Sequence, residues 1–232
     1  MTKNHYTQQY FEARDYLDLH MAESIKILAN DSQAKGVLEV GCGTGKLVKF
    51  LNENGFTAIG CDIAEEALKR ARKINKKNSI IKASATKLPF KSGLFDLVAA
   101  ISLIEHLDKN ESQKFLKEAY RVLKSNGFIF LITPNFNSPF RFLCGKRWFG
   151  YGDPTHKQFF TPKSLSGLLK NNGFSNIKLR HKTAYNVKSE LHLPGFSRGW
   201  PLPVKNFLNW LMISSPLSTF RDSFWLLAQK KV

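Results

Sequence analysis

Cysteine is scarce in this sequence. Cys42, Cys61 and Cys144 are the three thiols among 232 residues, and they form neither a Cys-x-x-Cys pair nor a zinc-ligand spacing. A disulfide framework and a cysteine-based zinc site are therefore excluded, and a reducing compartment, which we expect to be the cytoplasm, is favoured. We expect Cys42 and Cys61 to fill small buried sites, because buried thiols behave as small hydrophobes.

Long apolar runs are also missing. No stretch approaches the roughly 18 apolar residues that a membrane-spanning helix needs. The first residues, Met-Thr-Lys-Asn-His-Tyr, lack the apolar core of a signal peptide. We expect a protein without a membrane span or a visible export signal, and one domain over residues 1–232, since this length suits a single core.

Acidic residues are few in the C-terminal part. Residues 135–232 hold 15 Lys and Arg against 3 acids, whereas residues 1–134 hold 20 against 15, and the formal net charge is +17. Such a surface attracts nucleic acid, anionic lipid or a phosphorylated substrate. The alternative is that these side chains only solvate the surface, which is also our interpretation of the basic run between Lys69 and Lys77.

A glycine-rich loop after an apolar strand is the most informative feature that is present. Leu-Glu-Val-Gly-Cys-Gly-Thr-Gly spans residues 38–45, and glycines there let the backbone approach a ligand and adopt angles closed to residues with a Cβ. Lys46 and Leu47 follow, so neither the dinucleotide fingerprint nor the P-loop is matched. Asp62 ends the next apolar stretch, where its carboxylate can accept hydrogen bonds from two ribose hydroxyls. We expect a ligand that contains ribose and need not carry a phosphate.

Apolar stretches alternate with helical patterns along the chain. We expect strands at about 36–41, 57–62, 79–83, 95–101, 127–132, 174–180 and 222–229, and helices at about 45–54, 64–75, 110–123 and 162–172. This rhythm predicts an α/β fold with a doubly wound parallel sheet. Residues 1–30 are expected to form a helical cover across the mouth of the ligand site, and the long insertions 134–160 and 184–220 to recognise a substrate.

The order of these motifs resembles that of the class I S-adenosylmethionine-dependent methyltransferases. The match runs from about residue 36 to about 183 and includes four stretches beyond the glycine loop: Asp62-Ile63, the segment from Ser84 to Phe90, the segment from Phe95 to His106, and the turn from Leu123 into the fifth strand. The resemblance implies a seven-stranded Rossmann-like sheet whose last strand is antiparallel.

The resemblance also implies S-adenosylmethionine as cofactor. Its binding residues would be Glu39, Gly41, Gly43, Gly45, Asp62, Ile63, Ser84, Ala85 and Ile101. The family usually has Asp at the position of Ser84, where it holds the adenine amino group. Ser84 can form a hydrogen bond but carries no charge, so the adenine contact is weakened here.

Two histidines are the catalytic candidates. His106 follows the fourth expected strand, and His156 precedes a Phe-Thr helix start. A histidine can remove the proton of a hydroxyl acceptor, because its pKa lies near neutrality. The alternative for His106 is a cap of the strand-to-helix turn. Ubiquinone-biosynthesis and small-RNA methyltransferases hold a divalent ion with Glu-x-x-Glu-His and a later histidine; here Ser102 replaces the first carboxylate, so we predict no metal.

Acceptor contacts are expected from the cover and the first insertion. The candidate substrate-binding residues are Tyr6, Tyr10, Arg141, Arg147 and Trp148. Aromatic faces beside cations suit a sugar, a nucleotide or a ring with an anionic tail, although the same aromatics could form a local satellite core. Segment 204–213 has a helical apolar face that we expect to pack on the domain or on a second copy in a homodimer, with a membrane surface as the alternative.

The sequence as a whole predicts an S-adenosylmethionine-dependent methyltransferase that methylates oxygen on a small or lipid-linked acceptor. It resembles the ubiquinone-biosynthesis enzymes and those of glycan and lipid-precursor synthesis. An RNA methyltransferase is the alternative that the charge supports, and a cofactor-binding pseudo-enzyme serving as a partner subunit is the non-catalytic one. We expect a cytoplasmic protein that is peripheral to an anionic membrane if its acceptor carries a lipid.

Overall fold

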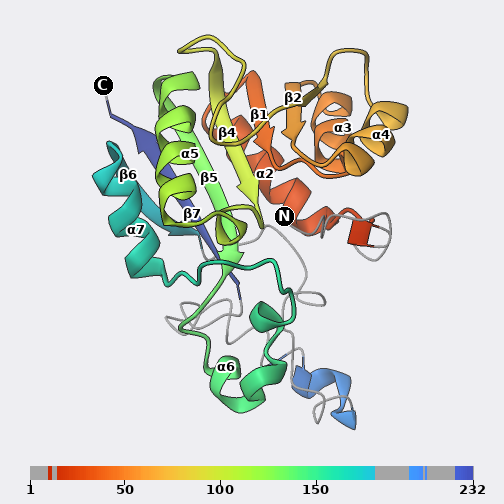
Figure 1. Cartoon of the computed structure of the whole chain (residues 1–232). Helices are drawn as coiled ribbons and strands as arrows, with labels where there is room; N and C mark the ends of the chain where they lie inside the picture. The colour runs from red at the N-terminus through yellow and green to blue at the C-terminus, as the bar shows by residue number, and fades with distance from the viewer. Residues whose placement is uncertain (1–9, 12–14, 181–198, 206, 208–222, 232) are drawn as a thin grey trace, which may run out of the picture.

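The structure is a computed structural model of the chain, and it describes residues 10–11, 15–180, 199–205, 207 and 223–231 (Figure 1). Along these residues helices separate most of the seven strands, and β4 follows β3 directly. The strands are β1 (Gly36–Val40), β2 (Thr57–Asp62), β3 (Ile80–Lys82), β4 (Phe95–Ile101), β5 (Leu123–Pro134), β6 (Phe174–Arg180) and β7 (Ser223–Lys230). The longer helices are α2 (Leu19–Asp31), α3 (Lys46–Glu53), α4 (Glu65–Ile74), α5 (Lys109–Val122) and α7 (Pro162–Asn171).

The seven strands form one sheet in the order β3-β2-β1-β4-β5-β7-β6. Neighbours from β3 to β5 pair in parallel, and β7 inserts antiparallel between β5 and β6. The predicted doubly wound sheet with an antiparallel last strand is therefore confirmed. The order reverses between β1 and β4, and ligands bind outside the carboxyl ends of the strands at such a switch point.

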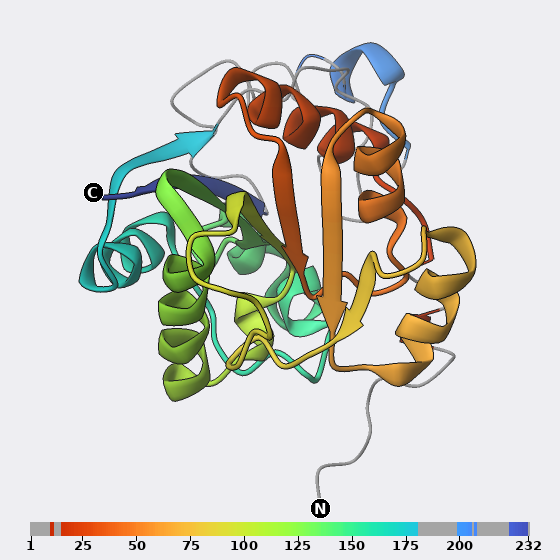
Figure 2. The ribbon, with the colours of Figure 1, turned by 90° about the horizontal axis from the view of Figure 1, so that it is seen from above.

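Helices cover both faces of the sheet, as Figure 2 shows from above. Side chains alternate along each strand, so Leu38 and Val40 face the core beneath α5 and α7, whereas Val37 faces the core beneath α2, α3 and α4. The strands are apolar on both sides because neither face meets water. This burial holds the carboxyl edge of the sheet rigid, and the site is built on that edge.

The N-terminal helix has a different place from the one expected. We predicted that residues 1–30 cover the mouth of the ligand site, but α2 lies on the face of the sheet, where Ala22, Ile25 and Ala29 are fully buried. Its apolar stripe packs better against the sheet than over an opening to water. The described residues ahead of α2 are the ones that reach the site: Phe11 packs against the start of α4, and Lys46 donates to the backbone oxygen of Asp15 at 2.6 Å.

The first insertion forms a lobe beyond the carboxyl end of β5, at the bottom of Figure 1. It contains α6 (Pro139–Cys144) and two 3-10 turns, Gly145–Arg147 and Phe149–Tyr151. The lobe closes on itself, because Asn135 and Phe160 form a parallel bridge and the Phe136 N–H donates to the Phe160 oxygen at 2.8 Å. We call residues 135–160 the insertion lobe.

The second insertion, expected at 184–220, lies largely outside the described residues. Within it the structure describes residues 199–205 and 207, of which 202–205 and 207 are helical. The apolar face expected on segment 204–213 is thus described at Val204 and Phe207, both exposed, while Leu211 lies outside the described residues. Across the described part of the chain, no helix combines the length and hydropathy needed to cross a bilayer.

Candidate active site

The glycine loop has the backbone conformation that its sequence predicts. Gly41, Gly43 and Gly45 have φ values of 77°, 50° and 72°, in the left-handed region that favours glycine. A Cβ on Gly43 would meet no protein atom within 4 Å, whereas one on Gly45 would lie 2.8 Å from the Ala71 Cβ. Gly43 therefore presents bare backbone to a ligand, and Gly45 allows α3 and α4 to approach closely.

Asp62 ties this loop to the end of β2. Its Oδ2 accepts from the Gly43 N–H at 2.9 Å, and its Oδ1 accepts from the Ala64 N–H at 2.8 Å. An ionised carboxylate offers about four acceptor positions, so two remain for a pair of ribose hydroxyls. The loop and Asp62 fit an adenosine ligand, and the sequence did not reveal that Asp62 also fixes the loop.

The other expected cofactor residues lie along the same edge. Ile63 stands 63% exposed directly after Asp62, as an apolar side chain that contacts an adenine face would. Ser84 Oγ lies 2.9 Å from Thr86 Oγ1 and accepts from the Thr86 N–H, so this hydroxyl shapes its own turn. Ala85 and Ile101 are half-buried beside the two cores. Their roles in binding remain predictions.

Glu39 is a buried acid at the centre of this edge. It lies on β1 with 6% of its surface exposed, and its Oε2 has no hydrogen-bond partner among the described residues. Burial and the nearby charge of Asp62 raise the pKa of Glu39 well above its usual value. A positively charged ligand group at this edge would stabilise the ionised form, which agrees with the expected sulfonium and ammonium of the cofactor. Cys61 is buried nearby with its pKa raised to about 12, mainly by burial, as expected for an inert thiol.

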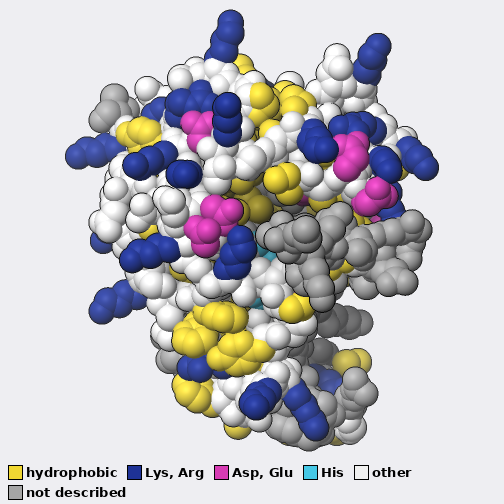
Figure 3. Space-filling view, in the orientation of Figure 1, with side chains coloured by type: hydrophobic (Ala, Val, Ile, Leu, Met, Phe, Trp, Pro, Cys, Tyr) yellow, Lys and Arg dark blue, Asp and Glu magenta, His cyan; other side chains and the backbone are white. Residues whose placement is uncertain are grey.

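The two catalytic candidates, His106 and His156, are in contact in the structure. His106 ends the 3-10 turn Ile104–His106 after β4, and His156 comes from the insertion lobe; their ring centroids are 4.8 Å apart. The His156 Nδ1 lies 2.6 Å from the Gly150 oxygen, and the His106 Nδ1 lies 2.8 Å from the Thr155 hydroxyl. Histidine side chains are visible in a hollow between the sheet domain and the insertion lobe (Figure 3).

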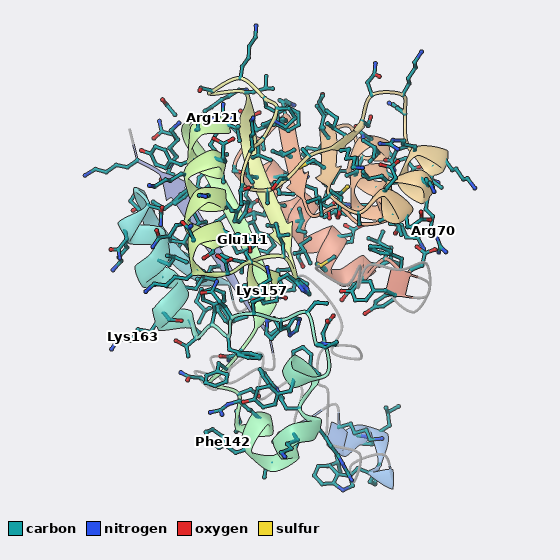
Figure 4. All side chains as sticks on the ribbon, viewed as in Figure 1. Arg70, Glu111, Arg121, Phe142, Lys157 and Lys163 are labelled. Atoms are coloured by element: carbon teal, nitrogen blue, oxygen red, sulfur yellow. The ribbon has the colours of Figure 1, made fainter. Side chains whose placement is uncertain are left out.

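The glycine loop adjoins this histidine pair. A Cβ on Gly41 would approach Leu103 Cδ1 to 3.0 Å, and Leu103 lies three residues before His106. The lobe is hydrogen-bonded to the same turn, because the backbone N–H groups of Lys157 and Gln158 donate to the backbone oxygen of Glu105 at 2.8 and 3.1 Å. Lys157 also pairs with Glu111 of α5 at 2.9 Å (Figure 4). The fold thus brings the cofactor loop, the histidines and the lobe together.

Glu105 is a site residue that we did not select from the sequence. It is 1% exposed, and its Oε2 accepts from the Thr133 hydroxyl at 3.0 Å. Burial, opposed by hydrogen bonds, raises the pKa of Glu105 to about 7. The signal was available as a carboxylate beside His106, but its burial depends on how β4, β5 and the lobe meet.

Three of these side chains could hold a metal ion. One ligand atom each from Glu105, His106 and His156 lies within 4.8 Å of the others. One carboxylate and two imidazoles suit zinc or another transition metal better than magnesium, which prefers oxygen ligands. Ser102 stands where the metal-binding relatives have their first carboxylate. The absence of a metal stays a prediction.

The expected acceptor residues are separated by the structure. Tyr10 reaches across to the lobe and donates to Asp153 Oδ2 at 3.0 Å, while Tyr6 lies outside the described residues. Trp148 is 2% exposed at the centre of a local aromatic core, so it is not placed to stack on an acceptor. Its ring contacts are with Phe136, Phe149, Tyr151 and Phe159. The satellite-core interpretation therefore holds for Trp148, because its large ring gains most by burial.

The outer end of the lobe carries an exposed apolar surface with cations. Phe142 and Leu143 of α6 are 71% and 66% exposed, and Figure 4 shows Phe142 at the end of the lobe. The Arg141 guanidinium lies 4.0 Å from the Phe136 ring centroid and 4.1 Å from that of Phe142. Arg147 lies in the next turn. We call Arg141, Phe142, Leu143, Lys146 and Arg147 the α6 tip.

The basic run on α4 is a solvated face, as expected. Lys69 pairs with Glu66 at 2.8 Å and Arg72 with Glu65 at 2.7 Å, and these side chains are largely exposed. Arg70 turns toward the N-terminal segment and lies 3.8 Å from Asp15. These pairs engage three of the six cations of the run, which agrees with a solvated face and not with an anion site.

Comparison with known proteins points to one kind of chemistry. A family model described as a methyltransferase domain matches residues 38–131. The ubiquinone biosynthesis O-methyltransferase of Pelagibacter ubique is 26% identical over 175 residues, covering 71% of this chain and 72% of that protein. The tRNA (carboxymethyluridine(34)-5-O)-methyltransferase of Arabidopsis thaliana is 36% identical over 98 residues, covering 42% of this chain and 23% of that protein.

A solved structure has the same fold over nearly the whole chain. It is described as a SAM-dependent methyltransferase and possible histamine N-methyltransferase from Thermotoga maritima. The TM-score is 0.66 at 20% identity, with 98% of this chain and 99% of that one covered. The shared fold includes the part of the chain on either side of the segment that the family model matches.

Proposed function

Because the chain belongs to the class I S-adenosylmethionine-dependent methyltransferases, we propose that it methylates a hydroxyl oxygen on a small or lipid-linked acceptor. S-adenosylmethionine is the cofactor, and the chain is an enzyme, which sets aside a purely structural partner subunit. When bound, the cofactor supplies a methyl group on an activated sulfonium. The protein must then align the acceptor, exclude water and remove the hydroxyl proton.

The histidine pair beside the glycine loop carries this proposal. His106 and His156 come from different parts of the chain, and their rings meet at 4.8 Å where Leu103 adjoins Gly41. A hydroxyl is a poor nucleophile until its proton is taken, and histidine is suited to take it near neutral pH. The Pelagibacter relative is named as an O-methyltransferase, which supports oxygen as the methylated atom.

The α6 tip supports an amphiphilic acceptor. Its exposed Phe142 and Leu143 offer apolar contact, and Arg141 of α6 with Lys146 and Arg147 of the following 3-10 turn offers cations. An acceptor with an anionic head group and an apolar tail would use both kinds of side chain. We therefore favour a lipid-linked acceptor over a free polar metabolite.

An RNA acceptor is the second candidate. The excess of basic residues after residue 134 and the tRNA-modifying Arabidopsis relative favour it. Phosphate contacts would make RNA binding fall steeply with salt, whereas apolar contact at the α6 tip would not. RNA that copurifies at low salt and is released at high salt would favour this candidate.

The decisive experiment follows the methyl group. The protein is incubated with methyl-labelled S-adenosylmethionine and a cell extract, which is then separated into lipid, RNA, glycan and protein. We expect label in the lipid fraction, or in the small molecules that remain outside all four fractions, as a bond that resists mild base, because ethers resist hydrolysis and esters do not. Label confined to RNA would replace the proposal with the second candidate.

The histidines provide the first prediction. His106→Ala and His156→Ala should bind S-adenosylmethionine nearly normally but lose turnover roughly 100-fold or more if they serve as bases. Calorimetry measures cofactor binding, and single-turnover transfer to the labelled acceptor measures chemistry. Wild-type turnover in both variants would assign proton removal to another group.

A further inference from the structure

A chain of hydrogen bonds runs from His106 to the N-terminal segment. The Thr155 hydroxyl oxygen lies 2.8 Å from His106 Nδ1 and 2.5 Å from Asp153 Oδ1. Asp153 Oδ1 also accepts from the Thr155 N–H at 2.9 Å, and Asp153 Oδ2 accepts from the Tyr10 hydroxyl at 3.0 Å. Tyr10, Asp153 and Thr155 thus form one connected set behind the histidine.

The protons in this chain can be assigned. Burial would raise the pKa of Asp153, but hydrogen bonds from Thr155 and Tyr10 outweigh it, and the pKa lies below its usual value. Asp153 is therefore a carboxylate at neutral pH and only accepts. A threonine hydroxyl has one proton, and Thr155 gives it to Asp153 over the short distance expected for a bond to a charged oxygen. The Thr155 oxygen must then accept from His106.

This assignment fixes the tautomer of His106. The Nδ1 carries the proton that Thr155 accepts, so in the neutral ring Nε2 carries the lone pair. His156 has the same arrangement, because its Nδ1 lies 2.6 Å from the Gly150 oxygen, which can only accept. The hydrogen bonds of the lobe therefore present Nε2 as the basic atom of both rings.

We propose that Thr155, held by Asp153 and Tyr10, is a positioning residue that keeps His106 in the tautomer with a basic Nε2. This inference rests on the proposed function, in which His106 takes the acceptor proton. As the acceptor oxygen forms its bond to the methyl carbon, the carbon–sulfur bond breaks and leaves a neutral thioether, and the hydroxyl proton moves to His106 Nε2. The imidazolium then donates through Nδ1 to Thr155, whose dipole is oriented by the Asp153 carboxylate.

The hydrogen-bonded series from Tyr10 to His106 also connects the base to the edge of the sheet where the cofactor is expected to bind. Tyr10 lies against Phe11, with ring centroids 5.2 Å apart, and both pack with Ala64 and Ala67 at the start of α4. Ala64 donates to Asp62, the expected ribose acceptor. The positioning residues are therefore anchored on the element that holds the cofactor, while the base itself follows β4.

The first test does not require activity. In protein labelled with 15N-histidine, the nitrogen shifts above the histidine pKa distinguish a protonated from a bare ring nitrogen, and the His106→Gln spectrum identifies the His106 signals. We expect a protonated Nδ1 and a bare Nε2 in the wild type. A wild-type His106 with its proton on Nε2 would overturn the inference whatever the reaction proves to be.

Substitutions at Thr155 test the consequence. Thr155→Val removes the hydroxyl at nearly constant shape and should shift His106 toward the other tautomer, lowering kcat roughly 10- to 100-fold with little change in cofactor Kd. Thr155→Ser keeps the hydroxyl and should restore both readouts to within about threefold of wild type. Thr57→Val, at an exposed threonine at the start of β2, is the matched control and should change neither.

The outcomes separate this inference from the proposed function. A Thr155→Val protein that keeps the wild-type tautomer, or that changes tautomer at unchanged kcat, would overturn the role of Thr155. If Thr155→Val fails to fold, Tyr10→Phe supplies the comparison. An unchanged tautomer of His106 and an unchanged kcat in that variant would exclude Tyr10 from the hydrogen-bonded series that positions His106. Failure to methylate any hydroxyl would end the proposed function but leave the measured tautomer intact.

Discussion

Asp62 has two tasks at the scale of the single residue. It holds the Gly43 and Ala64 N–H groups in the protein itself, and it keeps acceptor capacity for a ribose. A binding residue that is already fixed by the backbone loses little entropy when the ligand arrives. The carboxylate is therefore preorganised before the cofactor binds.

Replacement of this carboxylate is our second prediction. Asp62→Ala should weaken S-adenosylmethionine binding by about 1.5–3 kcal/mol, the scale for hydrogen bonds to a charged acceptor. Asp62→Asn keeps one acceptor oxygen and the size of the side chain, so it should lose less. Calorimetry on folded variants measures the affinity, and an unchanged Kd for Asp62→Ala would remove this residue from the cofactor site.

Glu105 leads to a prediction about pH. Its pKa is about 7 in the folded protein, against 4.5 as the usual value. Above pH 4.5 the unfolded chain releases this proton while the folded protein keeps it until about pH 7. The contribution of Glu105 to the free energy of unfolding should therefore fall by about 3 kcal/mol between these pH values and stay constant above them.

The matched variant isolates this effect from the other acids. Glu105→Gln keeps the acceptor for Thr133 but does not titrate, so its free energy of unfolding should not show this fall. Urea unfolding of both proteins at pH 5 and pH 8 gives the difference. A difference between variant and wild type that is the same at both pH values would mean that Glu105 titrates normally.

At the scale of the element, substitutions of glycines inside and outside the glycine loop separate effects on stability from effects on cofactor binding. Gly43 and Gly55 both have positive φ, and a Cβ on either would meet no protein atom within 4 Å. Each substitution by alanine should cost about 1–2 kcal/mol from left-handed backbone alone. Gly43→Ala should also weaken cofactor binding, because its Cβ would stand in the approach to the loop, whereas Gly55→Ala should not.

Gly45 extends the comparison to packing. A Cβ there would lie 2.7 Å from Asn75 Nδ2 and 2.8 Å from the Ala71 Cβ, so Gly45→Ala should lose more stability than Gly43→Ala. Thermal unfolding and cofactor calorimetry on the three variants give both quantities. Equal losses of affinity for Gly43→Ala and Gly55→Ala would show that the loop does not approach the cofactor.

The elements also show what sequence patterns can and cannot predict. The strands β2, β4 and β6 have the predicted bounds, because apolar runs between glycine and polar turns define them locally. The glycine loop and Asp62 were likewise predictable, since they follow strand ends. The face that α2 covers was not, because it depends on contacts between segments far apart in the chain. For Trp148 the sequence left an acceptor contact and a local aromatic core open, and the structure was needed to choose the core.

The histidine pair was predictable in part: the sequence indicated the two residues but not their hydrogen bonds. The motif positions indicated His106 and His156 separately, and parallel strands bring their carboxyl ends to one edge. The hydrogen bonds that select their tautomers come from Gly150, Asp153 and Thr155 of the lobe. The residues were predictable from the sequence, but their protonation needed the structure.

At the scale of the whole molecule, the insertion lobe beyond the carboxyl edge carries cations and exposed apolar side chains together. The part of the chain after residue 134 has 15 basic residues against 3 acids, and it includes the α6 tip. The N-terminal part balances its charges better, as the ion pairs of α4 illustrate. The α6 tip, where three cations lie beside Phe142 and Leu143, is therefore the surface that we expect to meet an anionic membrane.

The α6 tip gives the fifth prediction. Phe142→Ser together with Leu143→Ser should lower binding to vesicles of equal parts phosphatidylserine and phosphatidylcholine roughly tenfold, because apolar contact with the interface is lost. Cofactor affinity should not change. Leu94→Ser, at a residue 45% exposed ahead of β4, is the control and should bind vesicles like the wild type.

Co-sedimentation at two salt concentrations separates the two kinds of contact. At high salt the wild type should lose the part of its vesicle binding that comes from the cations of the α6 tip, because salt screens them. The double variant should lose most of its remaining vesicle binding at high salt, because it lacks the apolar contact. Undiminished vesicle binding of a folded double variant would exclude the α6 tip as a membrane contact. That result would also favour RNA as the ligand of the basic residues after residue 134.

The closure of the insertion lobe bears on how such enzymes diverge. The chain leaves β5 after Pro134 and enters α7 at Pro162, and the two ends of the lobe between them are joined by the bridge between Asn135 and Phe160. A segment whose ends already lie together can be lengthened, shortened or exchanged at little cost in loop-closure entropy and without a change in strand register. Descendants of one gene can thus acquire new acceptors by replacing a segment of about 25 residues, while the loop and the carboxylate expected to bind the cofactor are inherited unchanged.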